Sequence, residues 1–411
     1  MINVVELFSG IGSQVKALKR AGLSFEVKAI AEWDVNSLVA YDLIHHGPQD
    51  LSRYNNMTKD DLVDELFDYG LSMNGKETMS YKSLKAFNHE SLKRIKAAIE
   101  RTKNLVNIEN IKSSDLPNKI DLLTYSFPCQ DLSNMGAIHG YTNGIDRNFK
   151  TRSGMLWQVE RILIERKNSS FKMPKVLMLE NVPSLNSSKH KTSFEDWKKQ
   201  LETLGYENMT LTLNAVDFGI PQHRRRLILL SFLKDHLSLR KISKTDLESI
   251  KIEILQTVLD LPSLDNYLKL DYSKEIYLQE AISSTPNLTK SRLSIIAKNP
   301  ELVTNSDTPK TRKFVPTITT KQDRNPNSGL IYFNKHPNAN FSEYRYLTPR
   351  ECFLLMGFDE EDYDKLLMFN FRHRKNSMFF TRDKLYKMSG NSIVVNVLQN
   401  IFDILQSNDL F

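Results

Sequence analysis

A single cysteine stands in a sequence context that suits nucleophilic chemistry. Cys129 lies in the string Ser-Phe-Pro-Cys-Gln, directly after the apolar run KIDLLTYS (119–126), which is typical of a buried strand. Ligands of open α/β sheets bind outside the carboxyl ends of the strands, so this position favours a reactive thiol over a core cysteine. Residues 131–153 contain three glycines among polar and basic residues, a composition that suits a mobile lid better than a packed core.

An acidic side chain and two arginines stand at the ends of two further apolar runs. Glu180 follows the run KVLML, so a parallel sheet would turn its carboxylate to the same crevice as Cys129. Arg224 and Arg226 alternate ahead of a third run and therefore point to one face. Two guanidiniums on one face suit a phosphate or the carbonyl of a base. Taken singly, Glu180 is equally typical of a helix cap, and the arginines of a solvated basic run.

A glycine turn near the amino terminus is typical of a nucleotide site. Gly10 and Gly12 follow the run INVVEL and precede a helical pattern, so the backbone there can approach a ligand at a helix N-terminus. Glu32 lies about 20 residues further on, where an acidic side chain holds ribose hydroxyls, and Trp33 beside it can stack on adenine. Val15 stands where a dinucleotide fingerprint has Gly or Ala. The turn alone therefore leaves three alternatives, which are no ligand, nicotinamide and adenosylmethionine.

The elements that must position these residues alternate between strand and helix. This order predicts an α/β fold, with a doubly wound, mostly parallel, Rossmann-like sheet that carries helices on both faces. The apolar runs of strand length lie at 2–7, 25–33, 119–126, 175–182 and 226–232, and helical patterns lie between them, including 154–167 and 194–204.

Two regions interrupt this alternation and predict the domain organisation. Residues 46–104 are polar and helical in pattern, and we interpret them as a helical insert within a first domain at 1–232. Residues 233–340 are rich in Thr, Ser, Asn, Lys and Pro and begin a second, smaller lobe that extends to 379. The C-terminal segment 380–411 is expected to return to the first domain.

Composition narrows the class of protein. The chain has 411 residues, a net charge of +7 and two cysteines, too few for a disulfide framework. No run approaches the roughly 18 apolar residues of a membrane helix, and the first residues do not resemble a secretory signal. We therefore expect a cytoplasmic protein without membrane contact, whose charge is compatible with a polyanionic partner.

Six strings in order resemble the cytosine-5 DNA methyltransferase family over almost the whole chain, except for 46–104 and most of 233–340. The resemblance implies a target-recognition region at about 233–340. The strings are ELFSGIG (6–12), SFPCQ (126–130), LENV (179–182), QHRRR (222–226), RYLTPREC (345–352) and GNSIVV (390–395).

The resemblance also implies a role for each site residue. Cys129, Glu180, Arg224 and Arg226 would be catalytic, and S-adenosylmethionine would be the cofactor, without a metal. The residues expected around the cofactor are Phe8, Gly10, Gly12, Glu32, Trp33, Leu156, Asn391, Ile393 and Asn107, the last standing where the family usually has Asp. The residues expected at DNA are Gln130, Ser133, Arg152, Gln222, Thr317 and Arg324.

The implied reaction is attack of the Cys129 thiolate on carbon 6 of a flipped-out cytosine, followed by methylation of carbon 5. Glu180 would hydrogen-bond ring nitrogen 3 and the exocyclic amine, and Arg226 the carbonyl at position 2. The expected partner is double-stranded DNA, bound by a monomer. The family also predicts a restriction-modification setting, in which a cognate endonuclease would not bind stably.

Four other functions stay open at this point. An exocyclic-amino methyltransferase would need an Asn/Asp/Ser-Pro-Pro-aromatic string, whereas the chain has Ser-Phe-Pro-Cys. A tRNA cytosine methyltransferase would share the catalytic strings. A nicotinamide-dependent oxidoreductase would leave Cys129 and Glu180 unexplained. A catalytically silent DNA-binding relative would not need the intact Cys129, Glu180, Arg224 and Arg226.

Overall fold

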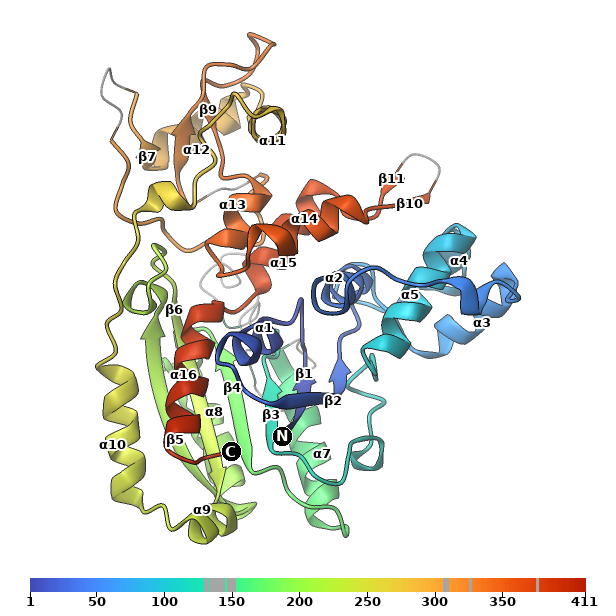
Figure 1. Ribbon diagram of the computed structural model, residues 1–411, viewed down its shortest axis with the longest axis vertical. Helices are drawn as coiled ribbons and strands as arrows, with labels where there is room; N and C mark the ends of the chain where they lie inside the picture. The colour runs from blue at the N-terminus through green and yellow to red at the C-terminus, as the bar shows by residue number, and fades with distance from the viewer. Residues whose placement is uncertain (129–131, 133–144, 146–152, 306–309, 325–326, 375–376) are drawn as a thin grey trace.

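A six-stranded sheet forms the centre of the first domain (Figure 1). The computed structural model describes residues 1–411 except 129–131, 133–144, 146–152, 306–309, 325–326 and 375–376. The strand order is β2-β1-β3-β4-β6-β5, and the first four of these strands are parallel. The strands are β1 (Ile2–Leu7), β2 (Phe25–Ala31), β3 (Leu122–Tyr125), β4 (Val176–Asn181), β5 (Tyr206–Asn214) and β6 (Arg225–Leu233).

The predicted α/β fold is confirmed, with two differences. Strand β6 runs antiparallel to both β4 and β5. Strand β5 was not predicted, because it alternates buried and half-exposed residues at the sheet edge and so lacks the continuous apolar run of a central strand. Successive residues of the central strands point to opposite faces, so each face has its own hydrophobic core.

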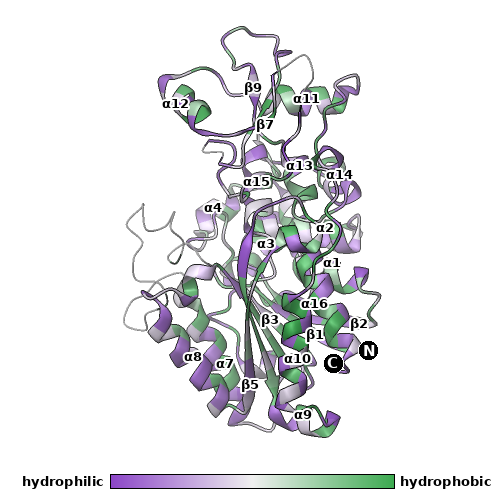
Figure 2. Ribbon diagram, turned by 90° about the vertical axis from the view of Figure 1, so that its left-hand side faces the viewer, coloured by the Kyte–Doolittle hydropathy of each residue, from purple (hydrophilic) through white to green (hydrophobic). Residues whose placement is uncertain are grey.

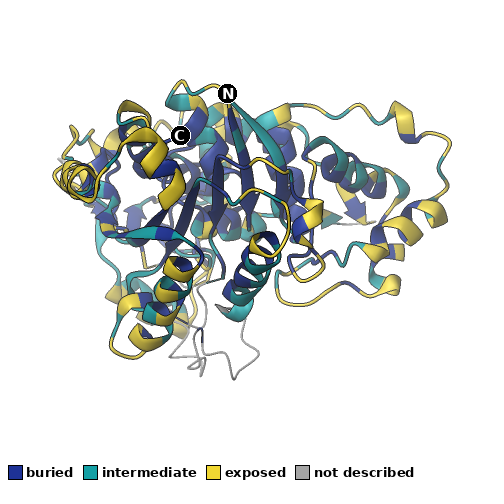
Figure 3. Cartoon of the chain, turned by 90° about the horizontal axis from the view of Figure 1, so that it is seen from below, coloured by how far each residue is buried: buried dark blue, intermediate teal, exposed yellow. Residues whose placement is uncertain are grey.

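Helices cover both faces of the sheet, and Figure 2 shows α7 and α8 on one side and α1, α10 and α16 on the other. The central strands between them are buried, and exposed residues gather on the outer helices (Figure 3). The covering helices are α1 (Ser13–Arg20), α2 (Val35–His46), α7 (Leu156–Lys167), α8 (Lys191–Thr203), α9 (Lys234–Arg240), α10 (Lys244–Leu255) and α16 (Val395–Ser407). Because α9 and α10 belong to this layer, the core of the sheet continues past residue 232, the predicted boundary.

The insert between β2 and β3 is helical and packs on α2. Its helices are α3 (Lys59–Asp68), α4 (Tyr81–Lys85) and α5 (His89–Arg101). Leu62, Leu66, Leu92 and Ile95 join the same hydrophobic cluster as α2, so the insert adds to the first domain's core.

The second lobe has a small core of its own, around Leu264, Leu302 and Ile331. It contains α11 (Glu275–Ser283), α12 (Lys290–Lys298), β7 (Glu301–Val303), β8 (Leu330–Tyr332) and β9 (Tyr344–Arg345). In Figure 1 a helical layer lies between this lobe and the sheet domain. The layer contains α13 (Pro349–Leu354), α14 (Glu360–Met368), the hairpin β10 (Arg372–Arg374) and β11 (Ser377–Met378), and α15 (Arg382–Asn391).

Short 3-10 helices occupy several connections, at Ser52–Tyr54, Ser113–Asp115, Ser153–Met155, Pro183–Asn186, Ala215–Phe218 and Leu264–Asn266. Among the described residues, no helix is both long and apolar enough to cross a membrane.

Candidate active site

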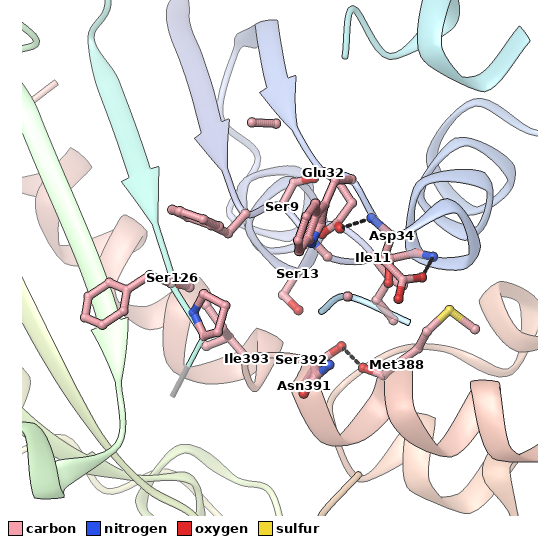
Figure 4. Close-up of a pocket in the computed structure, with 18 of the residues that line it drawn as sticks. Ser9, Ile11, Ser13, Glu32, Asp34, Ser126, Met388, Asn391, Ser392 and Ile393 are labelled. Carbon is pink, nitrogen blue, oxygen red and sulfur yellow. Dashed lines mark hydrogen bonds between the residues drawn. The ribbon is translucent and has the colours of Figure 1, made fainter. Parts of the chain in front are cut away.

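A pocket opens at the carboxyl ends of β1, β3 and β4, the edge at which parallel sheets bind ligands (Figure 4). Glu32 and Asp34 lie on one side of it, and Asn391, Ser392 and Ile393 on the opposite side. Segments from the two ends of the chain therefore form one site. The predicted residues that line this pocket are Phe8, Gly10, Glu32, Trp33, Asn107, Glu180, Arg224, Arg226, Asn391 and Ile393.

Glu32 connects the glycine turn to the end of β2. One carboxylate oxygen accepts a hydrogen bond from the backbone N–H of Gly10 at 2.9 Å, and the other from that of Asp34 at 2.8 Å. Burial, assisted by the charge of Asp34, raises the pKa of Glu32 to about 7. The two backbone bonds fix the carboxylate at the pocket, where its remaining lone pairs can accept from a ligand.

The glycines of the turn differ in what they face. Gly10 has φ +57° and no heavy atom within 4 Å of the place that a Cβ would take, so a ligand can approach its backbone closely. Gly12, at φ +81°, is absent from the lining, because a Cβ there would lie 2.2 Å from Nε2 of His45. Gly12 is needed for close packing of the turn on α2.

Of the predicted cofactor residues Leu156 and Asn107, only Asn107 lines the pocket. Leu156 begins α7 and is fully buried in the core on that face, so, contrary to the prediction, its side chain does not line the pocket. Asn107 lines the pocket, and its side-chain oxygen accepts from the backbone N–H of Glu109 at 3.0 Å.

Glu180 and Arg226 form an ion pair in the same pocket. The Arg226 Nε lies 3.2 Å from Oε1 of Glu180. Burial raises the pKa of Glu180, while the charges of Arg226 and Arg224 oppose that shift. Burial therefore favours the protonated carboxyl of Glu180 and the two arginines favour its ionised form, an environment that suits a group exchanging a proton with a base ring.

Arg224 is buried and tied to the protein backbone. Its guanidinium donates to the carbonyl oxygens of Ile318 at 2.8 Å, Gly390 at 2.9 Å and Ser392 at 2.8 Å. These bonds join the end of α15, which lines the pocket, to the segment at 315–320, which does not. Arg224 therefore holds one wall of the site against the second lobe.

The residues expected at DNA fall into three groups. Gln222 is fully buried, donates to the Leu355 carbonyl oxygen and accepts from the Ile318 N–H, an arrangement that favours structural support over DNA contact. Thr317 is half-buried and donates to the His223 carbonyl oxygen, whereas Arg324 is exposed beside Asp323. The third group, Gln130, Ser133 and Arg152, lies outside the described residues, as does the predicted nucleophile Cys129.

The described neighbours of Cys129 are attached to the loop that follows β4. Pro128 lines the pocket, and the carbonyl oxygen of Phe127 accepts from Asn181 at 3.2 Å. On the other side, the carbonyl oxygen of Leu132 accepts from the Ser184 hydroxyl at 2.6 Å. The described residues on both sides of Cys129 are therefore bonded to residues that closely follow Glu180 in the chain.

Sequence reasoning missed several lining residues, among them Asn74, Gly75 and Lys387. Lys387 lies four residues before Asn391 in α15, so helical spacing from Asn391 was a usable signal. Asn74 and Gly75 lie in the insert, and no local pattern connects them with the pocket.

Comparison with known proteins agrees with this architecture. The family model for C-5 cytosine-specific DNA methylase matches residues 65–407. The orphan methyltransferase M.SssI of Spiroplasma monobiae is 34% identical over 98% of this chain and 96% of its own length. The type II methyltransferase M2.ScrFI of Lactococcus lactis subsp. cremoris is 31% identical over 98% of each chain.

A solved structure extends the likeness to the whole fold. The Dnmt2 methyltransferase of S. pombe has a TM-score of 0.58 and 18% identity, and the match covers 99% of each chain. The pocket, the order of the strings and the two relatives together exclude the oxidoreductase and exocyclic-amino alternatives. The chain belongs to the C-5 cytosine-specific DNA methylase family and is a DNA (cytosine-5) methyltransferase.

Proposed function

We propose that the chain transfers a methyl group from S-adenosylmethionine to carbon 5 of a flipped-out cytosine in a specific duplex DNA sequence, with Cys129 as nucleophile. One observation carries the proposal. Glu180 and Arg226 line the same pocket as Glu32 and Trp33, and Pro128 leads the chain from that pocket into Cys129. Methyltransferases of this family use S-adenosylmethionine, which supports the choice of donor.

The lining residues fit this donor. Glu32 would accept hydrogen bonds from ribose hydroxyls, and Trp33 offers a flat aromatic face for adenine. The open space at Gly10 admits the amino-acid end close to the backbone. When bound, the donor supplies an electrophilic methyl group. Phe8, Asn107, Asn391 and Ile393 would complete the enclosure.

The chain's own residues would then activate the base. The Cys129 thiolate attacks carbon 6 and forms a C–S bond, and the ring electrons move toward carbon 5. Glu180 supplies a hydrogen bond or proton at nitrogen 3, and Arg226 binds the oxygen at position 2. Carbon 5 would gain the methyl group with S-adenosylhomocysteine as the leaving product. A base would then remove the carbon 5 proton, and the C–S bond would break to restore the thiolate. A positively charged guanidinium, such as that of Arg226, would also favour the thiolate form of Cys129.

DNA would lie between the two lobes, with the target base turned out of the helix at a cost of a few kcal/mol. Gln130, Ser133, Arg152, Thr317 and Arg324 are the proposed DNA contacts. Gln222 and Arg224 would act indirectly, by holding the segment at 315–320 in place.

We propose a monomer that acts in the cytoplasm as the modification enzyme of a restriction-modification system. The type II name of one relative supports this setting. A second candidate is a methyltransferase without a cognate endonuclease, which the orphan name of the other relative favours.

Bisulfite sequencing of plasmid DNA from cells that express the chain tests the reaction and reads the target sequence. We expect methylated cytosines in one sequence context for the wild type and for Cys352→Ala, whose thiol is buried and has a raised pKa. We expect none for Cys129→Ala, although that variant should still bind duplex DNA. Methylation by Cys129→Ala would refute the nucleophile assignment. A purified enzyme that methylates tRNA and not duplex DNA would refute the substrate assignment.

A further inference from the structure

One turn of the helical insert reaches the pocket. Within residues 72–77, here called the insert turn, Asn74 and Gly75 line the same cavity as Glu32 and Trp33. The turn is closed internally, since the Ser72 hydroxyl donates to the Glu77 carbonyl oxygen at 2.6 Å and accepts from the Gly75 N–H at 2.9 Å. The part of the insert that lines the pocket is thus a turn stabilised by its own hydrogen bonds.

The insert turn is bonded to the backbone that carries the acidic and aromatic residues of the pocket. The Ser72 N–H donates to the Trp33 carbonyl oxygen at 2.7 Å, and the Val35 N–H donates to the Ser72 carbonyl oxygen at 2.9 Å. This short parallel bridge spans Asp34. These bonds therefore fix the insert turn to the segment that contains Glu32 and Trp33.

Two lysines of α15 hold the insert turn from the other side. The Lys387 ammonium lies 2.6 Å from Oδ2 of Asp34 and donates to the Asn74 carbonyl oxygen at 2.9 Å. The Lys384 ammonium donates to the Met73 carbonyl oxygen at 2.9 Å. The Lys387 side chain is only 25% exposed and lines the pocket, so its ion pair is shielded from water more than a surface pair would be.

We propose that the insert turn is a wall of the methyl-donor site, and that Lys387 is the positioning residue that holds it against Asp34 beside Glu32 and Trp33. The inference rests on the proposed function, because it assigns this pocket to S-adenosylmethionine. It gives the insert at 46–104 a part in cofactor binding. It also means that three separate segments, the end of β2, the insert turn and α15, must meet before the donor is held tightly.

The charges of these groups support the same assignment. Glu32 faces Asp34 on its own segment and Lys387 from α15, and Glu109 lines the same pocket. Asp34 raises the pKa of Glu32 and Lys387 lowers it. Loss of the Lys387 charge would thus favour the protonated form of Glu32, which is the poorer acceptor for ribose hydroxyls.

Titration calorimetry with S-adenosylhomocysteine on the purified full-length chain tests the inference. For Lys387→Met we expect the dissociation constant to rise by about tenfold or more, a loss of about 1.4 kcal/mol. In this variant, protonation of Glu32 should weaken binding of S-adenosylhomocysteine at a higher pH than in the wild type. Lys387→Arg should recover most of the affinity. In turnover assays, KM for the donor should rise more than kcat falls.

Lys365→Met is the matched control. Lys365 is ion-paired with Glu361 at 2.8 Å and its side chain is 27% exposed, but it does not line the pocket. Equal affinity of Lys387→Met and Lys365→Met would overturn the inference. If Lys387→Met proves too unstable to titrate, Lys384→Met tests the same wall through Met73, and wild-type affinity in that variant would count against it. A wild-type chain that binds no S-adenosylhomocysteine would instead refute the proposed function.

Discussion

Substitution of Gly390 by alanine tests whether the stability of the chain at this position is set by close packing or by helix propensity. Gly390 lies in α15, and its φ is not in the left-handed region, so propensity alone predicts that alanine stabilises the chain by up to about 1 kcal/mol. A Cβ at this position would, however, lie 2.5 Å from the carbonyl carbon of Thr319 and 2.5 Å from the nitrogen of Thr320. Both are backbone atoms and cannot rotate away.

Close packing predicts instead that alanine at position 390 destabilises the chain. Overpacking of this kind costs roughly 1–3 kcal/mol. Moving the segment at 315–320 away from α15 would also strain the buried bonds that Arg224 makes to Ile318 and Gly390, at about 1.5–3 kcal/mol for a bond lost. We therefore expect Gly390→Ala to lower the free energy of unfolding by roughly 1–3 kcal/mol, and by roughly 2.5–6 kcal/mol if one of the Arg224 bonds is also lost.

Urea unfolding followed by tryptophan fluorescence measures this change as a shift of the transition midpoint. Gly22→Ala is a useful reference, because Gly22 has φ +65° and no heavy atom within 4 Å of a Cβ position, so it reports backbone strain without overlap. A Gly390→Ala chain with the wild-type midpoint, or a higher one, would show that the contact between α15 and Thr319 is not as close as described, and the role assigned to Arg224 would lose its basis.

Two further predictions concern the acids of the pocket. The pKa of Glu32 in the folded chain, about 7, lies above its ordinary value of 4.5, so its contribution to stability is full below pH 4.5 and is lost as the pH rises through 7. Glu32→Gln should therefore flatten the decline in urea midpoint between these pH values, and an unchanged pH profile would contradict the assignment. Glu180→Gln should lower kcat by roughly 10²–10⁴-fold in single-turnover methylation. A variant with wild-type kcat would exclude Glu180 from the chemistry.

Local patterns in the sequence were sufficient for five of the six strands of the sheet and for the residues at its carboxyl edge. Gly10, Glu32 and Glu180 each follow an apolar run directly, and the rule that parallel strands open at one edge brings them together without further information. The alternation of apolar residues with helical patterns likewise predicted helices on both faces, as the two hydrophobic cores confirm.

Features that depend on contacts between distant segments were not predictable in this way. Gly12 meets His45, and Gly390 meets Thr319, only because two helices and a loop pack closely. The insert turn reaches the pocket through bonds from Ser72 to Trp33 and from Lys387 to Asn74, and neither pair is linked by any spacing rule. The antiparallel direction of β6 similarly depends on how the chain returns from β5, which apolar content does not reveal.

The pairing of α16 with α1 has a consequence for synthesis of the protein on the ribosome. Leu398, Ile401 and Leu405 of α16 share a hydrophobic cluster with Val15 and Leu18 of α1 (Figure 1). Since translation adds about 5–20 residues per second, α1 emerges roughly 20 s or more before the helix that covers it. During that interval the nascent polypeptide carries an uncovered apolar surface next to its glycine turn, and the site at Asn391 does not yet exist. The pocket lined by Asn391 can therefore form only when elongation is nearly complete, and until then the apolar face of α1 is open to other contacts.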